Sequence, residues 1–415
     1  MSQVTVATEQ ERQQNSSLFS RNISALALSS AIRAMGGFIG VYLPLYFVQI
    51  GGDPFTLGML TFAASLVQLV FLPIGGFIAD NHGRRKIMVT AALLGAVFPF
   101  LYAVAQDWRV FGLITVFAAI GAISNPATRA TVVDSIPPEK RTTGIAALQV
   151  VSTLPSIISP SIGGWIILKY GLEDGFKVAC IYGAVFALIS IIPLFAMLKE
   201  TLHPKDAQKD RSPSRNSILS FEKPSFLGLP QSLKALMASY ALVVFANGAV
   251  SQYYILYASN VVGLTAFDWG AVVSLQILVA SVVRIPGGWL SDKFGKKRAM
   301  AFSLLLTIPM ILIFTMSQSL TQVVVSALLL VAAGIYYAPA HEALQADLTP
   351  RPVRGRVNAL WDMSSFLAVG LGALAGGFAY QTFGPAVPFY IFATTELAAA
   401  ALLISKVKEP EIKEA

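Results

Sequence analysis

Long apolar segments, separated by short polar stretches, constrain this chain more than any other feature of its sequence. Most are long enough to cross the hydrocarbon core of a bilayer as an α-helix, which takes about 20 residues. None alternates apolar and polar residues in the manner of a barrel strand, so each predicts a transmembrane helix. The segments are 23–47, 54–78, 87–104, 110–133, 144–168, 178–198, 233–262, 269–290, 299–316, 323–348, 357–380 and 387–407.

The composition agrees with this reading. Hydrophobic residues make up 55% of the chain and charged residues only 13%, whereas soluble domains carry about 25% charged residues. We therefore expect an all-α membrane protein of twelve transmembrane helices. Residues 1–198 would form one six-helix bundle, 199–230 a polar linker loop, and 231–415 a second bundle. Residues 1–20 are polar and show no cleavable signal peptide.

The distribution of positive charge predicts the orientation. With the N-terminus inside, most of the 30 Lys and Arg residues fall in the inner loops and tails, and the outer loops hold Arg109, Lys169 and Lys177. Because positively charged loops resist translocation, both termini should be cytoplasmic in a multi-pass protein of the cell membrane. The same distribution explains the net charge of +8 without a nucleic-acid partner.

The chain also contains an internal repeat. The sequence GGFIADNHGRRK at 75–86 returns as GGWLSDKFGKKR at 287–298, and Pro126, Asp134 and Arg141 return as Pro339, Asp347 and Arg354. Each copy holds six segments, an even number, so the two copies should share one orientation. They should be related by a pseudo-two-fold axis along the membrane normal, with a solute path between them.

The repeated loop predicts a network at the cytoplasmic membrane edge. Its glycines should allow close helix approach or a tight turn, and its acidic and basic side chains should pair. Arg284 should belong to the same inner layer. The residues of this expected cytoplasmic gate are Gly76, Asp80, Gly83, Arg84, Asp134, Arg284, Gly288, Asp292, Gly295, Lys296 and Asp347.

These loops resemble motif A of the major facilitator superfamily, in the same place in both halves. The resemblance implies a twelve-helix fold with two pseudo-symmetric bundles, working by alternating access. It also implies that Asp80 latches against the start of the eleventh helix near Arg354–Val357, and Asp292 against the start of the fifth. An aspartate there would be attracted by the helix N-terminus. The alternative is that the loops are topology signals only.

The fifth segment carries Pro160, Gly163 and Gly164 in the order SPSIGG, with Ser159 at the first position. This is similar to motif C of drug–proton antiporters, whose first residue is glycine. The eleventh segment contains a comparable run of small residues, GALAGG, at 372–377. The resemblance favours export. Ordinary packing of small residues between helices is the alternative.

Ionisable residues at bilayer depth are costly and are functional candidates by default. Arg33 and Asp362 lie well inside the first and eleventh segments. Asp362 would be the proton or cation site, and Arg33 would tune the pKa of its carboxyl group. Glu396 is also mid-segment, and a buried neutral carboxyl with no transport role is an equal alternative. The expected substrate or proton site consists of Asp362, Arg33, Asn358, Gln149, Asn247, Tyr254 and Tyr336.

Together these features predict a secondary transporter for small organic solutes, with proton-coupled efflux of amphiphilic compounds as the leading function. Uptake or exchange of an organic anion held by Arg33 is the alternative, as is a non-transporting solute sensor on the same fold. An enzyme is not expected, because the sequence shows no nucleophile motif or paired catalytic carboxylates. His82, His203 and His341 are far apart, so neither a metal site nor a cofactor is expected. The partners expected are a small-molecule substrate, protons and the lipid bilayer, for a monomer.

Overall fold

The structure is a computed structural model of the 415-residue chain. It describes residues 20–137, 140–202, 229–350 and 354–409, except for the side chains of 142, 284–292, 294 and 354–356. Most of the predicted linker therefore lies outside the described residues. Every regular element in the described ranges is helical.

Twelve helical spans are long and apolar enough to cross a membrane, which confirms the predicted fold class. Their bounds extend most predicted segments by a few residues, because the charged end residues continue the helices. The helices are α2 (Arg21–Met35), α3 (Ile39–Gln49), α4 (Pro54–His82), α5 (Arg84–Val104), α6 (Trp108–Ala118), η1 (Ala119–Ser124), α7 (Asn125–Ser135), α8 (Arg141–Thr153), η3 (Leu154–Ile157), α9 (Ser159–Tyr170), α10 (Leu172–Met197), α12 (Gln231–Ser251), α13 (Tyr253–Asn260), α14 (Ala266–Phe294), α15 (Lys296–Thr315), α16 (Leu320–Leu348), α17 (Arg354–Phe383) and α18 (Val387–Lys406).

Four spans are interrupted. The first breaks between α2 and α3 at a Gly-Gly pair, and the fourth passes through the 3-10 helix η1 just before Pro126. The fifth passes through η3 at Pro155, and the seventh breaks between α12 and α13. Irregular backbone at membrane depth is tolerated where it is buried in protein or lines a cavity, so these breaks indicate where to look for a site.

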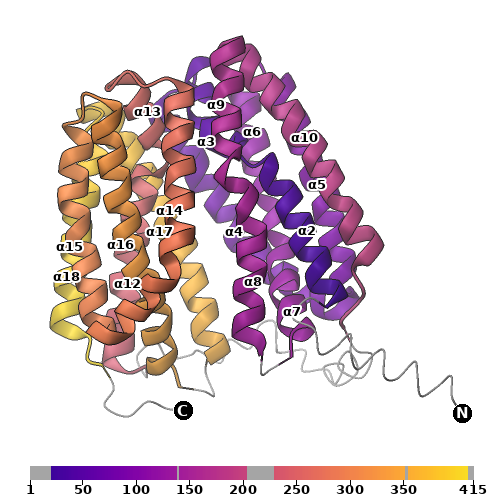
Figure 1. Cartoon of the computed structure of the whole chain (residues 1–415), viewed down its shortest axis with the longest axis vertical. Helices are drawn as coiled ribbons and strands as arrows, with labels where there is room; N and C mark the ends of the chain where they lie inside the picture. Colours follow the sequence, from indigo (N-terminus) through magenta and orange to yellow (C-terminus); the bar gives the residue numbers. More distant parts are fainter. Residues whose placement is uncertain (1–19, 138–139, 203–228, 351–353, 410–415) are drawn as a thin grey trace, which may run out of the picture.

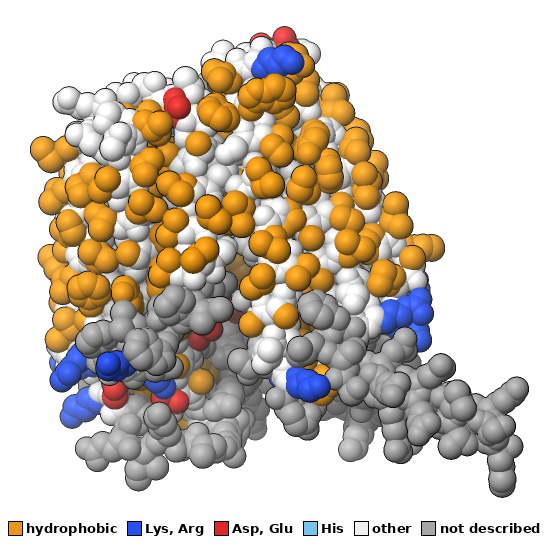
Figure 2. All heavy atoms as spheres, in the orientation of Figure 1, with side chains coloured by type: hydrophobic (Ala, Val, Ile, Leu, Met, Phe, Trp, Pro, Cys, Tyr) orange, Lys and Arg blue, Asp and Glu red, His pale blue; other side chains and the backbone are white. Residues whose placement is uncertain are grey.

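The spans form two halves of six (Figure 1). In that view the halves lie against each other at the upper end and diverge toward the lower end, where α2 begins and α18 ends. We call these the opposite end and the termini end. Hydrophobic side chains cover the flank between the two ends, and Lys and Arg gather mainly at the termini end (Figure 2). This surface suits a lipid environment.

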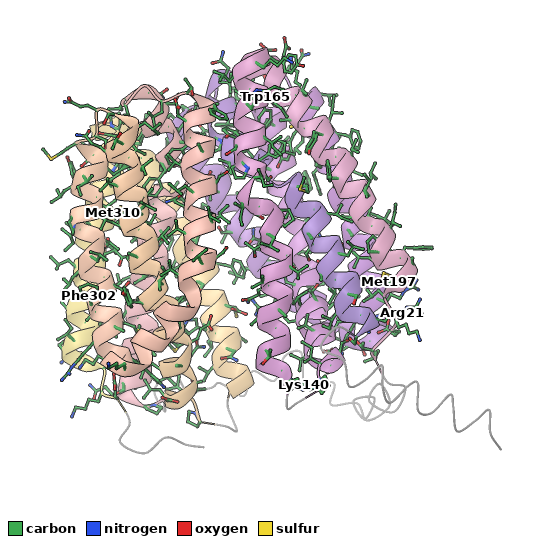
Figure 3. The ribbon with its side chains drawn as sticks, viewed as in Figure 1. Arg21, Lys140, Trp165, Met197, Phe302 and Met310 are labelled. Carbon is green, nitrogen blue, oxygen red and sulfur yellow. The ribbon has the colours of Figure 1, made fainter. Side chains whose placement is uncertain are left out.

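The first and last helices of the first half are joined by hydrogen bonds at the termini end. The Arg21 guanidinium, at the start of α2, donates to the carbonyl oxygens of Ala196 and Met197 at the end of α10, both at 2.9 Å. Figure 3 shows Arg21 and Met197 together at the termini end, with Trp165 at the opposite end. The first and sixth spans of this half are thus fixed to each other.

Candidate functional site

The opposite end is closed by a tyrosine from the first half. The hydroxyl of Tyr42 in α3 lies 2.7 Å from the Pro160 carbonyl oxygen and 3.0 Å from that of Ala266, so it can donate to either. Pro160 belongs to α9 of its own half, whereas Ala266 begins α14 of the other half. Beside it, the Ser161 and Ser274 hydroxyl oxygens meet across the interface at 2.8 Å. The predicted motif at Pro160, Gly163 and Gly164 therefore lies at the contact between the halves.

The second half repeats this closure. The hydroxyl of Tyr253 in α13 lies 3.1 Å from the Ala373 carbonyl oxygen of α17 and 3.2 Å from that of Pro54, which begins α4 of the first half. Glycines allow the two halves to approach closely at both of these contacts. A Cβ on Gly58 would lie 2.3 Å from the Ala373 oxygen, and one on Gly164 would lie 2.4 Å from the Ala266 oxygen. Pseudo-symmetry thus extends to individual hydrogen bonds.

A charged contact joins the halves nearer the termini end. The Arg129 guanidinium of α7 lies 3.0 Å from an Asp362 carboxylate oxygen of α17. The two side chains are 71% and 35% exposed, so water screens the pair. The sequence predicts that Arg33 acts on Asp362. The structure instead pairs Asp362 with Arg129.

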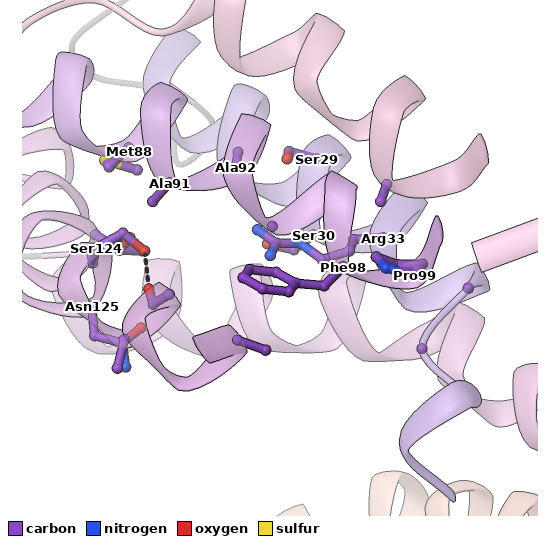
Figure 4. A pocket seen from close by; sticks show the side chains of 18 of the residues that line it. Ser29, Ser30, Arg33, Met88, Ala91, Ala92, Phe98, Pro99, Ser124 and Asn125 are labelled. Atoms are coloured by element: carbon purple, nitrogen blue, oxygen red, sulfur yellow. Dashed lines mark hydrogen bonds between the residues drawn. The ribbon is translucent and has the colours of Figure 1, made fainter. Parts of the chain in front are cut away.

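Arg33 faces a cavity of about 620 Å³ inside the first half. Its walls come from α2, α5, η1 and α10, and Figure 4 shows Ser30, Phe98 and Asn125 around it with Arg33. The breaks in the first and fourth spans, at Gly36–Gly37 and Gly121–Ser124, both border this cavity. In the described part of the chain, Arg33 makes no ion pair.

The other predicted site residues are dispersed. Asn358 and Gln149 are exposed, and the Gln345 amide donates to the Asn358 side-chain oxygen at 3.1 Å. Asn247 is exposed and donates to its own helix at Val243.

Two predicted aromatic residues contact rings within the second half. Tyr254 lies among the rings of Phe314 and Phe389, each at 5.1 Å between centroids. Tyr336 packs edge-on against Phe302, at 5.8 Å. The place of these two tyrosines in the predicted substrate or proton site thus stays a prediction.

The predicted network at the termini end contains the same ion pair in both halves. Arg84 pairs with Asp134 in the first half, and Lys296 pairs with Asp347 in the second. The helix-start glycines before them, Gly83 and Gly295, have φ of 98° and 88°, as the predicted tight turns require. Asp80 is exposed near the end of α4.

One expectation about this network needs correction, and others lie outside the described residues. Gly75, and not Gly76, makes the close helix approach: a Cβ on Gly75 would lie 2.0 Å from the Ile123 oxygen, whereas one on Gly76 meets nothing nearer than 3.9 Å. The side chains of Arg284, Asp292 and the start of α17, together with the surroundings of Gly288, are not described. The latch of Asp80 onto that helix start thus stays a prediction.

Sequence reasoning missed two glutamates that cap the helices that follow these loops, α5 and α15. The Glu200 carboxylate accepts from the backbone N–H of Arg84 at 3.0 Å and of Arg85 at 3.1 Å, and Glu409 accepts from the N–H of Lys297 at 2.5 Å. Partial burial raises the pKa of Glu200, but hydrogen bonds from backbone N–H groups outweigh it and lower that pKa overall. A Lys-Glu pair follows both the sixth and the twelfth span, and this recurrence is the signal that could have revealed them.

Glu396 of α18 is 2% exposed, and its Oε2 has no hydrogen-bond partner in the described residues. The hydroxyls of Tyr254 and Tyr337 and the Nε2 of His341 share this property, and all four lie in the second half. The His341 ring stacks on Tyr240 at 4.3 Å. In the described residues, the interior of the second half therefore contains several unsatisfied polar atoms.

Known proteins resemble this chain along most of its length. The sequence profile described as Major Facilitator Superfamily matches residues 25–338 and 236–415. The multidrug resistance protein MdtG of Dickeya zeae is 25% identical over 336 residues, which cover 79% of each chain. The multi-drug resistance efflux pump PmrA homolog of Lactococcus lactis is 25% identical over 343 residues, covering 81% of this chain and 82% of that protein.

Solved structures agree on the fold. The nucleoside transporter NupG superimposes with a TM-score of 0.73 at 12% identity, covering 93% of this chain and 99% of that one. The D-xylose–proton symporter does so with a TM-score of 0.69 at 15% identity, covering 94% and 97%. The matching profile spans both halves, and the relatives are transporters, which agrees with the expectation that the chain is not an enzyme. The chain belongs to the Major Facilitator Superfamily.

Proposed function

We propose that this transporter exports small amphiphilic organic compounds in exchange for protons, by alternating access between its two halves. The observation that carries the proposal is the Arg129–Asp362 ion pair across the interface. An exposed pair of this kind contributes only about 0.2–1 kcal/mol. Loss of the negative charge on Asp362 would break this contact between the halves and release Arg129.

The relatives support the direction of transport, because two of the named matches are a multidrug resistance protein and an efflux pump. The conformation supports the cycle. Tyr42 and Tyr253 hold the two halves together at the opposite end, where each hydroxyl reaches a carbonyl oxygen of the other half. With both termini in the cytoplasm, as the charge distribution predicts, we assign this structure to a state closed on the outer side. Asp80, Asp292 and the paired loops would form the cytoplasmic gate in the other state.

Reconstitution into liposomes tests the proposal. A panel of cationic, neutral and anionic amphiphilic dyes should include members that move toward the more acidic compartment, and protein-free liposomes control for passive trapping. Asp362→Asn should lose this pH-driven movement and keep exchange of labelled for unlabelled dye. Movement away from the acidic compartment would instead identify a symporter. Absence of any saturable exchange would favour the sensor alternative and contradict transport.

A further inference from the structure

The Arg33 cavity has the chemistry of an anion-binding site. Its lining includes the Ser30 hydroxyl, the Gln68 and Asn125 amides, and the Arg33 guanidinium. It also includes apolar side chains such as Met88 and Phe98, and Figure 4 shows Phe98 beside Arg33. Pockets for small organic ligands usually combine an apolar wall with a few polar groups and occupy about 300–1,000 Å³, and this cavity measures about 620 Å³.

The described residues of the first half offer Arg33 no counter-charge at its depth. The acidic residues of its six spans are Asp80, Asp134, Glu173 and Asp174, and all lie within a few residues of helix ends. Asp134 is bound to Arg84, and Glu173 is bound to Lys177 at 2.7 Å. The Arg129 guanidinium, nearer the termini end of this half, already pairs with Asp362. Arg33 is therefore the deep cation that the described ion pairs leave uncompensated.

The neighbouring polar groups are also available. Among the described residues, the side chains of Ser30, Gln68 and Asn125 make no hydrogen bond, although all three line the cavity together with Arg33. A guanidinium presents two parallel N–H groups that fit both oxygens of a carboxylate. The amides and the hydroxyl can donate further hydrogen bonds to the same group.

We propose that this cavity binds the carboxylate of an amphiphilic organic anion through Arg33, with the apolar wall of α5 receiving its hydrophobic body. The inference deepens the proposed function, on which it rests, by naming a substrate class for the exporter. Because Arg33 is fixed in the first half, the carboxylate would travel with that half as it moves against the other.

Binding to purified protein tests this with a matched pair of probes, 2-naphthaleneacetate and its neutral amide, which share one hydrophobic body. The wild type should bind the acid at least about tenfold more tightly than the amide, equivalent to about 1.4 kcal/mol. Arg33→Gln should remove this preference by weakening the acid alone, and Arg33→Lys should retain part of it. Arg109→Gln is the control, because Arg109 is 72% exposed at the opposite end, and it should bind both probes as the wild type does.

Several results would overturn the proposal: wild type that does not prefer the acid, Arg33→Gln that keeps the preference, or a variant that loses both probes equally. Asn125→Leu offers a second variant should Arg33→Gln not fold, and it too should weaken the acid more than the amide. Loss of acid binding only in nanodiscs that contain an anionic phospholipid would assign the cavity to lipid headgroups instead. Because this assay measures binding, it can fail while pH-driven flux succeeds, and the reverse, so the two proposals are tested separately.

Discussion

The closure at the opposite end depends on glycines that leave no room for a methyl group, and Gly164→Ala tests it. The new Cβ would lie 2.4 Å from the Ala266 oxygen and 2.8 Å from the Phe267 Cα, both backbone atoms of the other half. A carbon–oxygen contact normally needs about 3.3 Å, so the halves must separate by about 0.9 Å. Overpacking of this kind costs about 1–3 kcal/mol. The part due to Ala266 and Phe267 disappears once the halves part, whereas the contact with the Tyr42 hydroxyl oxygen at 2.7 Å lies within the same half. The closed state should therefore lose up to about 150-fold in population relative to the open one.

Cysteine accessibility measures this shift. Ser274, which meets Ser161 across the interface, is replaced by cysteine in a Cys180→Ser background. A membrane-impermeant maleimide is then added on the side of the membrane that the opposite end faces. Gly164→Ala should accelerate labelling. Gly377→Ala should do the same, because its Cβ would lie 2.6 Å from the Pro54 oxygen in the symmetry-related contact. Gly334→Ala, whose Cβ meets nothing within 4 Å, is the control, and equal rates in Gly164→Ala and this control would refute the reasoning.

Further predictions concern the charged groups. Glu200→Gln should lower the free energy of unfolding by about 0.5–2 kcal/mol. The pKa of Glu200 in the folded state lies below its ordinary 4.5. The difference in free energy of unfolding between wild type and Glu200→Gln should therefore be full above pH 4.5 and shrink as the pH falls through the folded pKa. A pH-independent difference would argue against capping by the carboxylate. Asp347→Ala should cost more stability in chemical unfolding than Asp134→Ala, since these aspartates are 21% and 43% exposed; the reverse order would be inconsistent with burial as the cause. Glu396→Leu should raise the unfolding temperature, because an unpartnered buried polar group costs about 1–3 kcal/mol; a fall would reveal a role for the carboxyl in the fold.

Local features of the fold could be read from the sequence because they are set by local chemistry. Apolar length determines the spans, and the repeat places the same charges at the same positions in both halves. Arg84 and Asp134 recur as Lys296 and Asp347, and both pairs form ion pairs. The helix breaks at Gly36–Gly37 and Pro155 also coincide with residues that disfavour helix.

Contacts between the halves could not be read in this way, because they depend on how two rigid bundles meet. Depth alone suggested Arg33 as the partner of Asp362, but depth does not say which face of a bundle a side chain takes. Arg33 faces a cavity inside its own half, and Arg129 faces the interface. The same reason explains why Gly75 and not Gly76 makes the close approach, since neighbouring residues on a helix point about 100° apart.

The central claim is that the two ends open in alternation under control of Asp362, and distances between spin labels test it most directly. One pair, at Lys199 and Lys406, spans the two halves at the termini end, and another, at Lys169 and Thr321, spans them at the opposite end. In reconstituted protein, a change of pH should move the two distance distributions in opposite directions, and Asp362→Asn should abolish the response of both. Distances that change together, or that respond to pH equally in Asp362→Asn, would contradict the account.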